Sequence, residues 1–173
     1  LLSYIKAGTD DRIFAVAQLL RLGCNVQQIA FETKIDGFFL EKMKKIIEME
    51  NMLKANPWNR DVLHEAKRGG FSDRAVAWLW NTDEDTVFRI RKEMHLFPVY
   101  KMIDTCASEF DSYVPYFYST YEEENESIAE DRKKILVLGS GPIRIGQGVE
   151  FDYSTVHAVK TIRNAGYEAI VIN

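Results

Sequence analysis

The sequence has 173 residues, which is enough for a moderate domain with a sizeable core. Its formal net charge of −4 favours neither nucleic acid nor an anionic membrane surface as a partner. It has no apolar run near the roughly 18 residues of a membrane span and no signal-peptide pattern at its start, so we expect a cytoplasmic protein.

Residues 9–95 predict a series of short helices. Thr9 fits the N-cap of the first one, with Asp10 and Asp11 at the positive end of its first turn. Gly23 is expected to end this helix. Apolar residues at helical spacing predict its buried face, which consists of Ile13, Phe14, Ala17 and Leu20.

Polar residues mark the starts of the next two helices. Asn25, followed three residues later by Gln28, fits a capping box. Asp36 fits the N-cap of a longer helix that Pro57 must end, because proline lacks an N–H and clashes with the preceding turn. The expected apolar face of this longer helix contains Phe39, Leu40, Met43, Ile46, Ile47 and Met49.

A shift of 47 positions brings the two halves of the helical region into register, as from Arg21 to Arg68. The other identical pairs are Gly23 with Gly70, Ala30 with Ala77 and Asp36 with Asp83. Similar residue types also coincide, namely Asn25 with Ser72, Ile29 with Val76, Leu40 with Val87 and Met43 with Ile90. We infer a duplicated three-helix unit, and two copies joined at residues 56–59 would form one compact all-α domain.

Residues 70–89 also fit a helix-turn-helix, which raises nucleic-acid binding as an alternative function. The second helix of this motif would open with Asp83, Glu84 and Asp85, whose charges repel phosphate. Acidic and basic residues are balanced over residues 68–95. We therefore favour packing and protein contacts, and expect no nucleic-acid partner.

Tryptophan and tyrosine point to further contacts. Trp78 and Trp80 lie on opposite sides of one helix, so we expect one in the core and the other free for an interface. Aromatic residues crowd the stretch between Pro98 and Glu126, whereas flexible linkers are poor in aromatic residues. This stretch should therefore pack on a surface, and the acidic run that follows it should be a solvated boundary.

The last part of the chain predicts a strand at 135–138, a helix at 151–164 and a strand at 169–172. This order is typical of a parallel βαβ crossover. Two parallel strands cannot cover their own faces, so we expect this unit to be unstable unless it packs on another part of the protein. The chain stops as an α/β domain begins, and we interpret this as a truncated unit of a longer protein.

A glycine-rich loop lies between the first of these strands and the helix. It fails the dinucleotide fingerprint, because Arg144 stands where a third glycine is needed. It also fails the P-loop pattern, because Gln147 and Gly148 replace the lysine and the Ser/Thr. The simplest interpretation is a tight turn in which glycines supply positive φ angles.

The longer string GSGPIRIGQGVEFDYSTVHA at residues 139–158 closely resembles the start of the second synthetase half of the carbamoyl phosphate synthetase large subunit. The strings PVYKMIDTCASEF at 98–110 and YFYSTYEEE at 116–124 resemble the segment that leads into that half. The resemblance implies a helical oligomerisation domain at 1–97, a connector packed on it at 98–131, and the N-terminal part of a Rossmann-like pre-ATP-grasp subdomain at 132–173.

The resemblance also implies the chemistry of the parent enzyme. Bicarbonate, ammonia from glutamine and two ATP molecules give carbamoyl phosphate for pyrimidine and arginine synthesis. The parent is expected to use ATP, Mg²⁺ or Mn²⁺, and K⁺, with a glutaminase that is either a separate small subunit or fused. Both ATP-grasp lobes are missing from this sequence, so we expect self-association from this fragment but no catalytic residue, metal ligand, bound cofactor or activity.

Within that family, we expect the glycine loop to shape a passage for carbamate. Gly148 has no side chain and would keep such a passage open. Arg144, Glu150 and Asp152 would form an ion-pair network that fixes the loop, and simple loop scaffolding is the competing interpretation. The candidate residues are Gly139, Gly141, Arg144, Gly146, Gln147, Gly148, Glu150 and Asp152.

Overall fold

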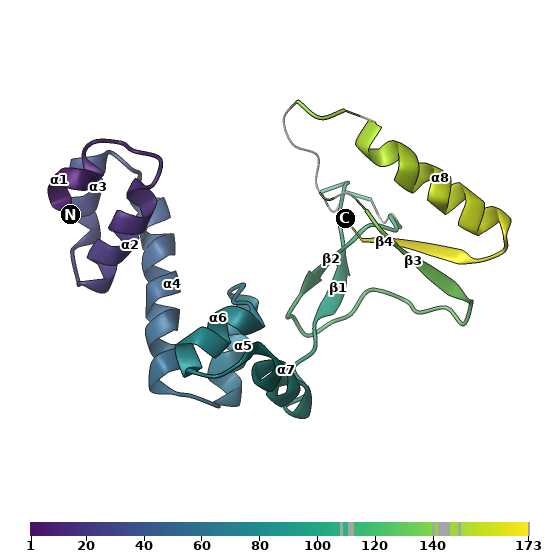
Figure 1. Ribbon diagram of the computed structural model, residues 1–173, viewed down its shortest axis with the longest axis horizontal. Coiled ribbons are helices and arrows are strands. Elements are labelled where there is room, and N and C mark those ends of the chain that lie inside the picture. The colour runs from purple at the N-terminus through teal and green to yellow at the C-terminus, as the bar shows by residue number, and fades with distance from the viewer. Residues whose placement is uncertain (108, 111–112, 140, 142–145, 149, 173) are drawn as a thin grey trace. The chain divides into compact units, whose positions relative to one another are not determined.

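The computed structural model describes residues 1–107, 109–110, 113–139, 141, 146–148 and 150–172. Contacts divide the chain into two compact units, Leu1–Ser127 and Ile128–Asn173, and each is described by itself. The first is helical and ends in a two-stranded ribbon, and the second contains two parallel strands and one helix (Figure 1). The expected fold class, mainly α with a parallel βαβ unit, is confirmed.

The first core lies among the four helices at the start of the chain. These are α1 (Leu2–Ile5), α2 (Arg12–Arg21), α3 (Val26–Thr33) and α4 (Gly37–Ala55). Their buried apolar side chains include Ile5, Val16, Leu19, Ile29, Leu40 and Ile47. Local signals explain the boundaries, because the Asn25 side chain caps α3 through the Gln27 N–H, and the Asp36 side chain caps α4 through the Phe38 N–H.

Helix α2 differs from its prediction in two ways. Its N-cap is Asp11 rather than Thr9, and the Asp11 carboxylate accepts a hydrogen bond from the Tyr4 hydroxyl at 2.6 Å rather than capping the helix. Ile13 and Phe14, predicted to be buried, are 52% and 75% exposed. The residues that face the core are Ala15, Val16, Leu19 and Leu20. Almost every residue in this stretch is apolar, so packing rather than periodicity selects the inward face.

Helix α4 connects two separate cores. Leu40 and Ile47 belong to the first core, whereas Leu53 belongs to the second. Phe39 and Ile46, predicted to be on the buried face, are mostly exposed. The two three-helix units thus lie within one compact unit but have separate cores, because a 19-residue helix is too long to be covered by a single three-helix unit.

The second core forms where α4 meets the next three helices. These are α5 (Arg60–Arg68), α6 (Asp73–Trp80) and α7 (Glu84–Glu93). Its buried apolar residues are Leu53, Leu63, Ala66, Val76, Ala77, Trp80, Val87 and Leu96. The Trp80 indole N–H donates to the Leu53 carbonyl at 2.9 Å, while Trp78 is 75% exposed, so the opposite orientations of these two side chains are confirmed.

The predicted duplication is visible in the backbone. Helices α6 and α7 begin 47 residues after α3 and α4, and their caps Ser72 and Asp83 occupy the positions of Asn25 and Asp36. Gly23 and Gly70 have φ angles of 82° and 87°, as required where the chain adopts a left-handed conformation after a helix in each copy. One detail is wrong: Gln28 accepts from the Cys24 thiol rather than completing a capping box with Asn25.

Two short strands follow the helices. Strands β1 (Val99–Met102) and β2 (Phe117–Thr120) pair antiparallel, with Val99 opposite Thr120 and Met102 opposite Phe117. The acidic run after β2 is more than a solvated boundary, because Glu126 accepts from the Met102 N–H at 2.6 Å and pairs with Lys101 at 3.1 Å. This run therefore continues alongside β1 and closes the ribbon's outer edge.

The second unit contains β3 (Lys134–Leu138), α8 (Glu150–Asn164) and β4 (Glu168–Ile172). The strands pair in parallel, with Lys134 opposite Glu168 and Leu138 opposite Ile172. These bounds match the predicted strand–helix–strand order. Apolar side chains on both strands remain exposed, including Leu136, Leu138, Ile170, Val171 and Ile172.

Candidate functional site

The glycine loop begins at the carboxyl end of β3. The Gly139 N–H donates to the Ile172 carbonyl at 2.7 Å, which ties the start of the loop to β4. Gly141 and Gly146 have φ angles of 85° and 89°, a region that side-chain-bearing residues rarely adopt. Gly148 is half-buried. The backbone thus needs glycine at two of the predicted positions for conformational reasons alone.

The structure describes only some residues of the predicted ion-pair network. Arg144 lies outside the described residues, and Glu150 is described only as the first residue of α8. Asp152 is a half-buried residue of the same helix, and Gln147 is half-buried beside Gly148. Both the network and the carbamate passage therefore stay predictions.

A different polar cluster is buried in the helical unit. We call Lys67, Asp73 and Arg91 the ionic cluster. The Asp73 carboxylate lies 2.8 Å from the Lys67 ammonium and 3.0 Å from the Arg91 guanidinium, and all three side chains are at most 12% exposed. Lys67 also donates to the Phe71 carbonyl at 2.7 Å, and Arg91 donates to the Leu96 carbonyl at 2.8 Å. The cluster thus holds the turns that follow α5 and α7.

The charges of the cluster are mutually stabilised. Burial is the largest single influence on the Asp73 carboxyl and by itself would raise its pKa. Hydrogen bonds from Arg91 and Lys67, together with their positive charges, outweigh burial and hold the pKa of Asp73 below its ordinary value. Asp73 therefore stays ionised at neutral pH.

Tyr121, the residue after β2, covers the ionic cluster. Its ring centroid lies 5.1 Å from the Lys67 ammonium and 5.6 Å from the Arg91 guanidinium carbon, within the range of cation–π contacts. Desolvation is the main cause that raises the pKa of the Tyr121 phenol, and the Arg91 charge partly opposes it. The ribbon is thus attached to α5 and α7 through an aromatic ring and two cations.

Sequence reasoning missed this cluster, although the repeat contained a signal for it. At the 47-residue shift, the three charged residues correspond to Leu20, Val26 and Lys44 of the first copy. Leu20 and Val26 are buried in the first core. Two apolar core positions are therefore replaced in the second copy by residues of opposite charge, a paired change that indicates a buried ion pair.

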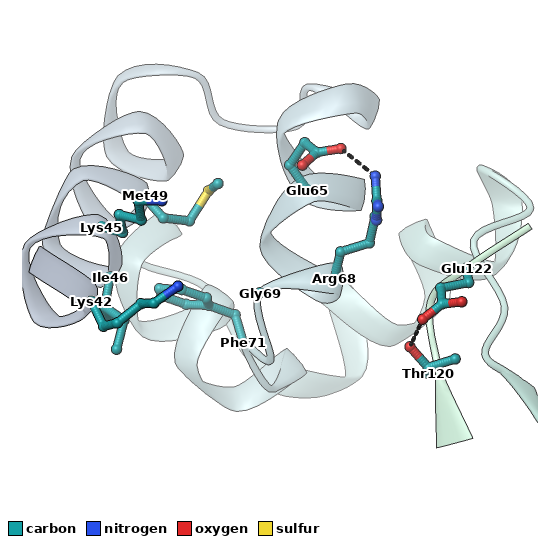
Figure 2. Close-up of a pocket in the computed structure, with 10 residues that line it drawn as sticks. All are labelled: Lys42, Lys45, Ile46, Met49, Glu65, Arg68, Gly69, Phe71, Thr120 and Glu122. Carbon is teal, nitrogen blue, oxygen red and sulfur yellow. Dashed lines mark hydrogen bonds and ion pairs between the residues drawn. The ribbon is translucent and has the colours of Figure 1, made fainter. Parts of the chain in front are cut away.

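A groove of about 710 Å³ runs between α4, the α5–α6 turn and the end of the ribbon (Figure 2). It is lined by Lys42, Lys45, Ile46, Met49, Glu65, Arg68, Gly69, Phe71, Thr120 and Glu122. Glu65 pairs with Arg68 at 3.3 Å, and the Thr120 hydroxyl donates to Glu122 at 3.4 Å. Its lining combines the apolar side chains of Ile46, Met49 and Phe71 with cations and carboxylates.

Two negative findings concern the described part of the chain. No three histidine, cysteine, aspartate or glutamate side chains there lie close enough to hold a metal ion. Within the same residues, every helix is too short or too polar to cross a membrane.

Comparison with known families assigns both ends of the chain. Residues 1–95 match the family model described as the carbamoyl-phosphate synthetase large chain, oligomerisation domain. Residues 131–173 match the model described as the carbamoyl phosphate synthase preATP-grasp domain. The first match covers both three-helix units and therefore more than half of the chain.

Proposed function

The chain belongs to the family of carbamoyl phosphate synthetase large chains, and on that premise we propose that it is the segment that joins the enzyme's assembly domain to its second synthetase half. The order of the two family matches along one chain carries this proposal. The parent enzyme would combine bicarbonate, ammonia from glutamine and two ATP molecules into carbamoyl phosphate, for pyrimidine and arginine synthesis in the cytoplasm.

The helical unit would provide self-association. An oligomerisation domain fits a surface on which large apolar side chains such as Phe14, Phe38 and Phe39 are exposed. The ribbon would connect this unit to the synthetase half along the chain, and Tyr121 and the ionic cluster attach the ribbon to α5 and α7.

The nucleotide and metal sites of the parent would lie in its ATP-grasp lobes. Mg²⁺ or Mn²⁺ would neutralise phosphate charge there, with K⁺ as an activator. The residues described here do not fit such a site, because they bring no three metal-ligating side chains together and the glycine loop has no lysine for a phosphate. A glutaminase, separate or fused, would supply ammonia to the parent.

For the glycine loop, we propose a role in shaping the carbamate passage. Its support is the half-burial of Gly148 beside a loop whose neighbouring glycines require positive φ angles. Gly148→Leu in the complete enzyme should lower carbamoyl phosphate formation while both partial ATPase activities persist. Unchanged coupling between ATP use and product formation would contradict a passage, and loss of both ATPase activities would indicate scaffolding instead.

The direct test of the assembly role uses the protein of 173 residues. We expect its weight-average mass in sedimentation velocity to rise with concentration, and we expect no carbamoyl phosphate from ATP, bicarbonate and ammonia. A constant monomer mass across the concentration range would contradict self-association. A salt-dependent mobility shift with duplex DNA would instead favour the helix-turn-helix alternative.

A further inference from the structure

The two copies of the three-helix unit differ at many exposed positions, in both directions; Phe88 of the second copy, 43% exposed, corresponds to Glu41 of the first. Seven large apolar residues of the first copy are 51% to 75% exposed. We call the five that have polar counterparts in the second copy the outer apolar set: Ile13, Phe14, Phe38, Phe39 and Ile46. At the 47-residue shift, their counterparts in the second copy are Arg60, Asp61, Asp85, Thr86 and Glu93. The same positions of one fold therefore carry apolar residues in one copy and polar residues in the other.

This difference identifies exposed apolar residues that the fold itself does not require. The counterparts are exposed, or half-buried in the case of Thr86, so the fold does not need an apolar side chain at these positions. Phe31 and Trp78 are a useful contrast, because they are exposed and aromatic in both copies and so do not distinguish them. Exposed apolar residues that the fold does not require are typical of a contact surface.

The outer apolar set lies on two neighbouring helices. Ile13 and Phe14 belong to α2, the other three belong to α4, and these helices pack against each other. The Phe38 and Phe39 rings meet edge to face with centroids 5.4 Å apart, and the Lys42 ammonium lies 5.1 Å from the Phe38 ring. The two phenylalanines thus form a compact aromatic knob at the start of α4.

We propose that the outer apolar set is where one copy of this chain binds a second copy, an inference that rests on the proposed self-association. Charges beside the knob suit an isologous contact, because Glu41 and Lys42 are both exposed and follow Phe38 by one turn. Around a two-fold axis, the Lys42 of one copy can face the Glu41 of the other. Apolar contact at the centre with paired charges at the rim is the usual anatomy of such an interface.

The test transplants the second copy's residues into the first. Phe38→Asp with Phe39→Thr gives α4 the residues found at the start of α7, where the same fold accepts them. Aspartate in the first turn also suits the positive end of a helix, so we expect an unchanged circular dichroism spectrum. Trp78→Asp is the matched control, because it removes an aromatic residue of the second copy that is 75% exposed, more than Phe38 or Phe39.

Sedimentation velocity of the 173-residue protein should show at least about a tenfold weaker association for the double variant and an unchanged constant for Trp78→Asp. Phe14→Asp, the residue of the second copy at that position, should weaken association on its own and serves if the double variant misfolds. If the wild type associates and neither first-copy variant weakens it, or if Trp78→Asp weakens it equally, this location of the interface is overturned while self-association stands. A wild type that stays monomeric overturns both.

Discussion

Removal of the Asp73 charge should destabilise the second core far more than removal of a surface carboxylate. Asp73→Asn keeps the shape of the side chain but leaves the ammonium of Lys67 and the guanidinium of Arg91 buried without an anion. Breaking a buried ion pair costs about 3–5 kcal/mol, and we expect about 3 kcal/mol because 12% of the Asp73 side chain still reaches solvent.

The assay can use the protein's own fluorescence. All three tryptophans lie in or beside the second core, and the Trp58 and Trp80 rings are 4.8 Å apart. Urea titration followed by tryptophan emission therefore reports on unfolding around the ionic cluster. The free energy of unfolding should fall with little change in the denaturant slope.

Asp61→Asn is the matched control. Asp61 is also in the first turn of a helix, but it is 91% exposed and lies 3.5 Å from Arg60, so its loss should cost less than about 1 kcal/mol. Equal losses for the two variants would refute the argument, because the cost would then come from the helix terminus and not from burial.

A second comparison separates removal of the whole ionic cluster from removal of the Asp73 carboxylate alone. The triple variant Lys67→Leu, Asp73→Val and Arg91→Leu takes the first copy's apolar residues at positions 67 and 73 and also removes the second buried cation. It removes the carboxylate without leaving Lys67 or Arg91 in the core, so it should lose less stability than Asp73→Asn alone. A greater loss of stability in the triple variant would show that the second core depends on the ion pair and cannot replace it with apolar residues.

The remaining predictions concern pH, the ribbon and the βαβ unit. The pKa of Asp73 is lower in the folded protein, so its stabilising contribution is present above the unfolded-state pKa of about 4 and is lost as pH falls through the folded value. The difference in unfolding free energy between wild type and Asp73→Asn should therefore shrink in acid. A difference that stays constant with pH would contradict this. Tyr121→Ala should speed proteolysis within residues 98–126, while Tyr121→Phe should not, because the ring rather than the hydroxyl contacts the two cations; equal rates for both would contradict this. Amide hydrogens of β3 and β4 should exchange faster than those of α4 to α6, since both strands expose their apolar side chains, and equal protection would show that the unit is stable as it stands.

The duplication also explains how one fold can take two roles. Both copies have helix starts, N-caps and left-handed glycines at equivalent positions, so the same backbone fold occurs twice. The first copy retains an apolar interior at Leu20 and Val26 and exposes apolar residues outside. The second copy has a charged cluster inside, which Tyr121 covers, and polar residues at the outer positions. Under the proposed interface, these substitutions would assign contacts outside the chain to the first copy, while the second copy contacts the ribbon through Tyr121.

The sequence by itself determined the features that depend on neighbouring residues. Caps at Asn25 and Asp36, the stop before Pro57, the repeat and the βαβ order follow from short-range spacing, because each is set by hydrogen bonds and sterics within a few residues. The family strings are likewise continuous stretches of chain, and the two family matches agree with them.

Only the tertiary structure decided which side chains face inward and which meet across the chain. Seven of the ten residues of α2 are apolar, so contact with α4 and not periodicity excludes Phe14 from the core. Strands β1 and β2 pair across residues 103–116, and the ionic cluster joins residues from three helices. Such contacts depend on where distant segments lie in space, and the burial that makes Asp73 important exists only after the helices have packed.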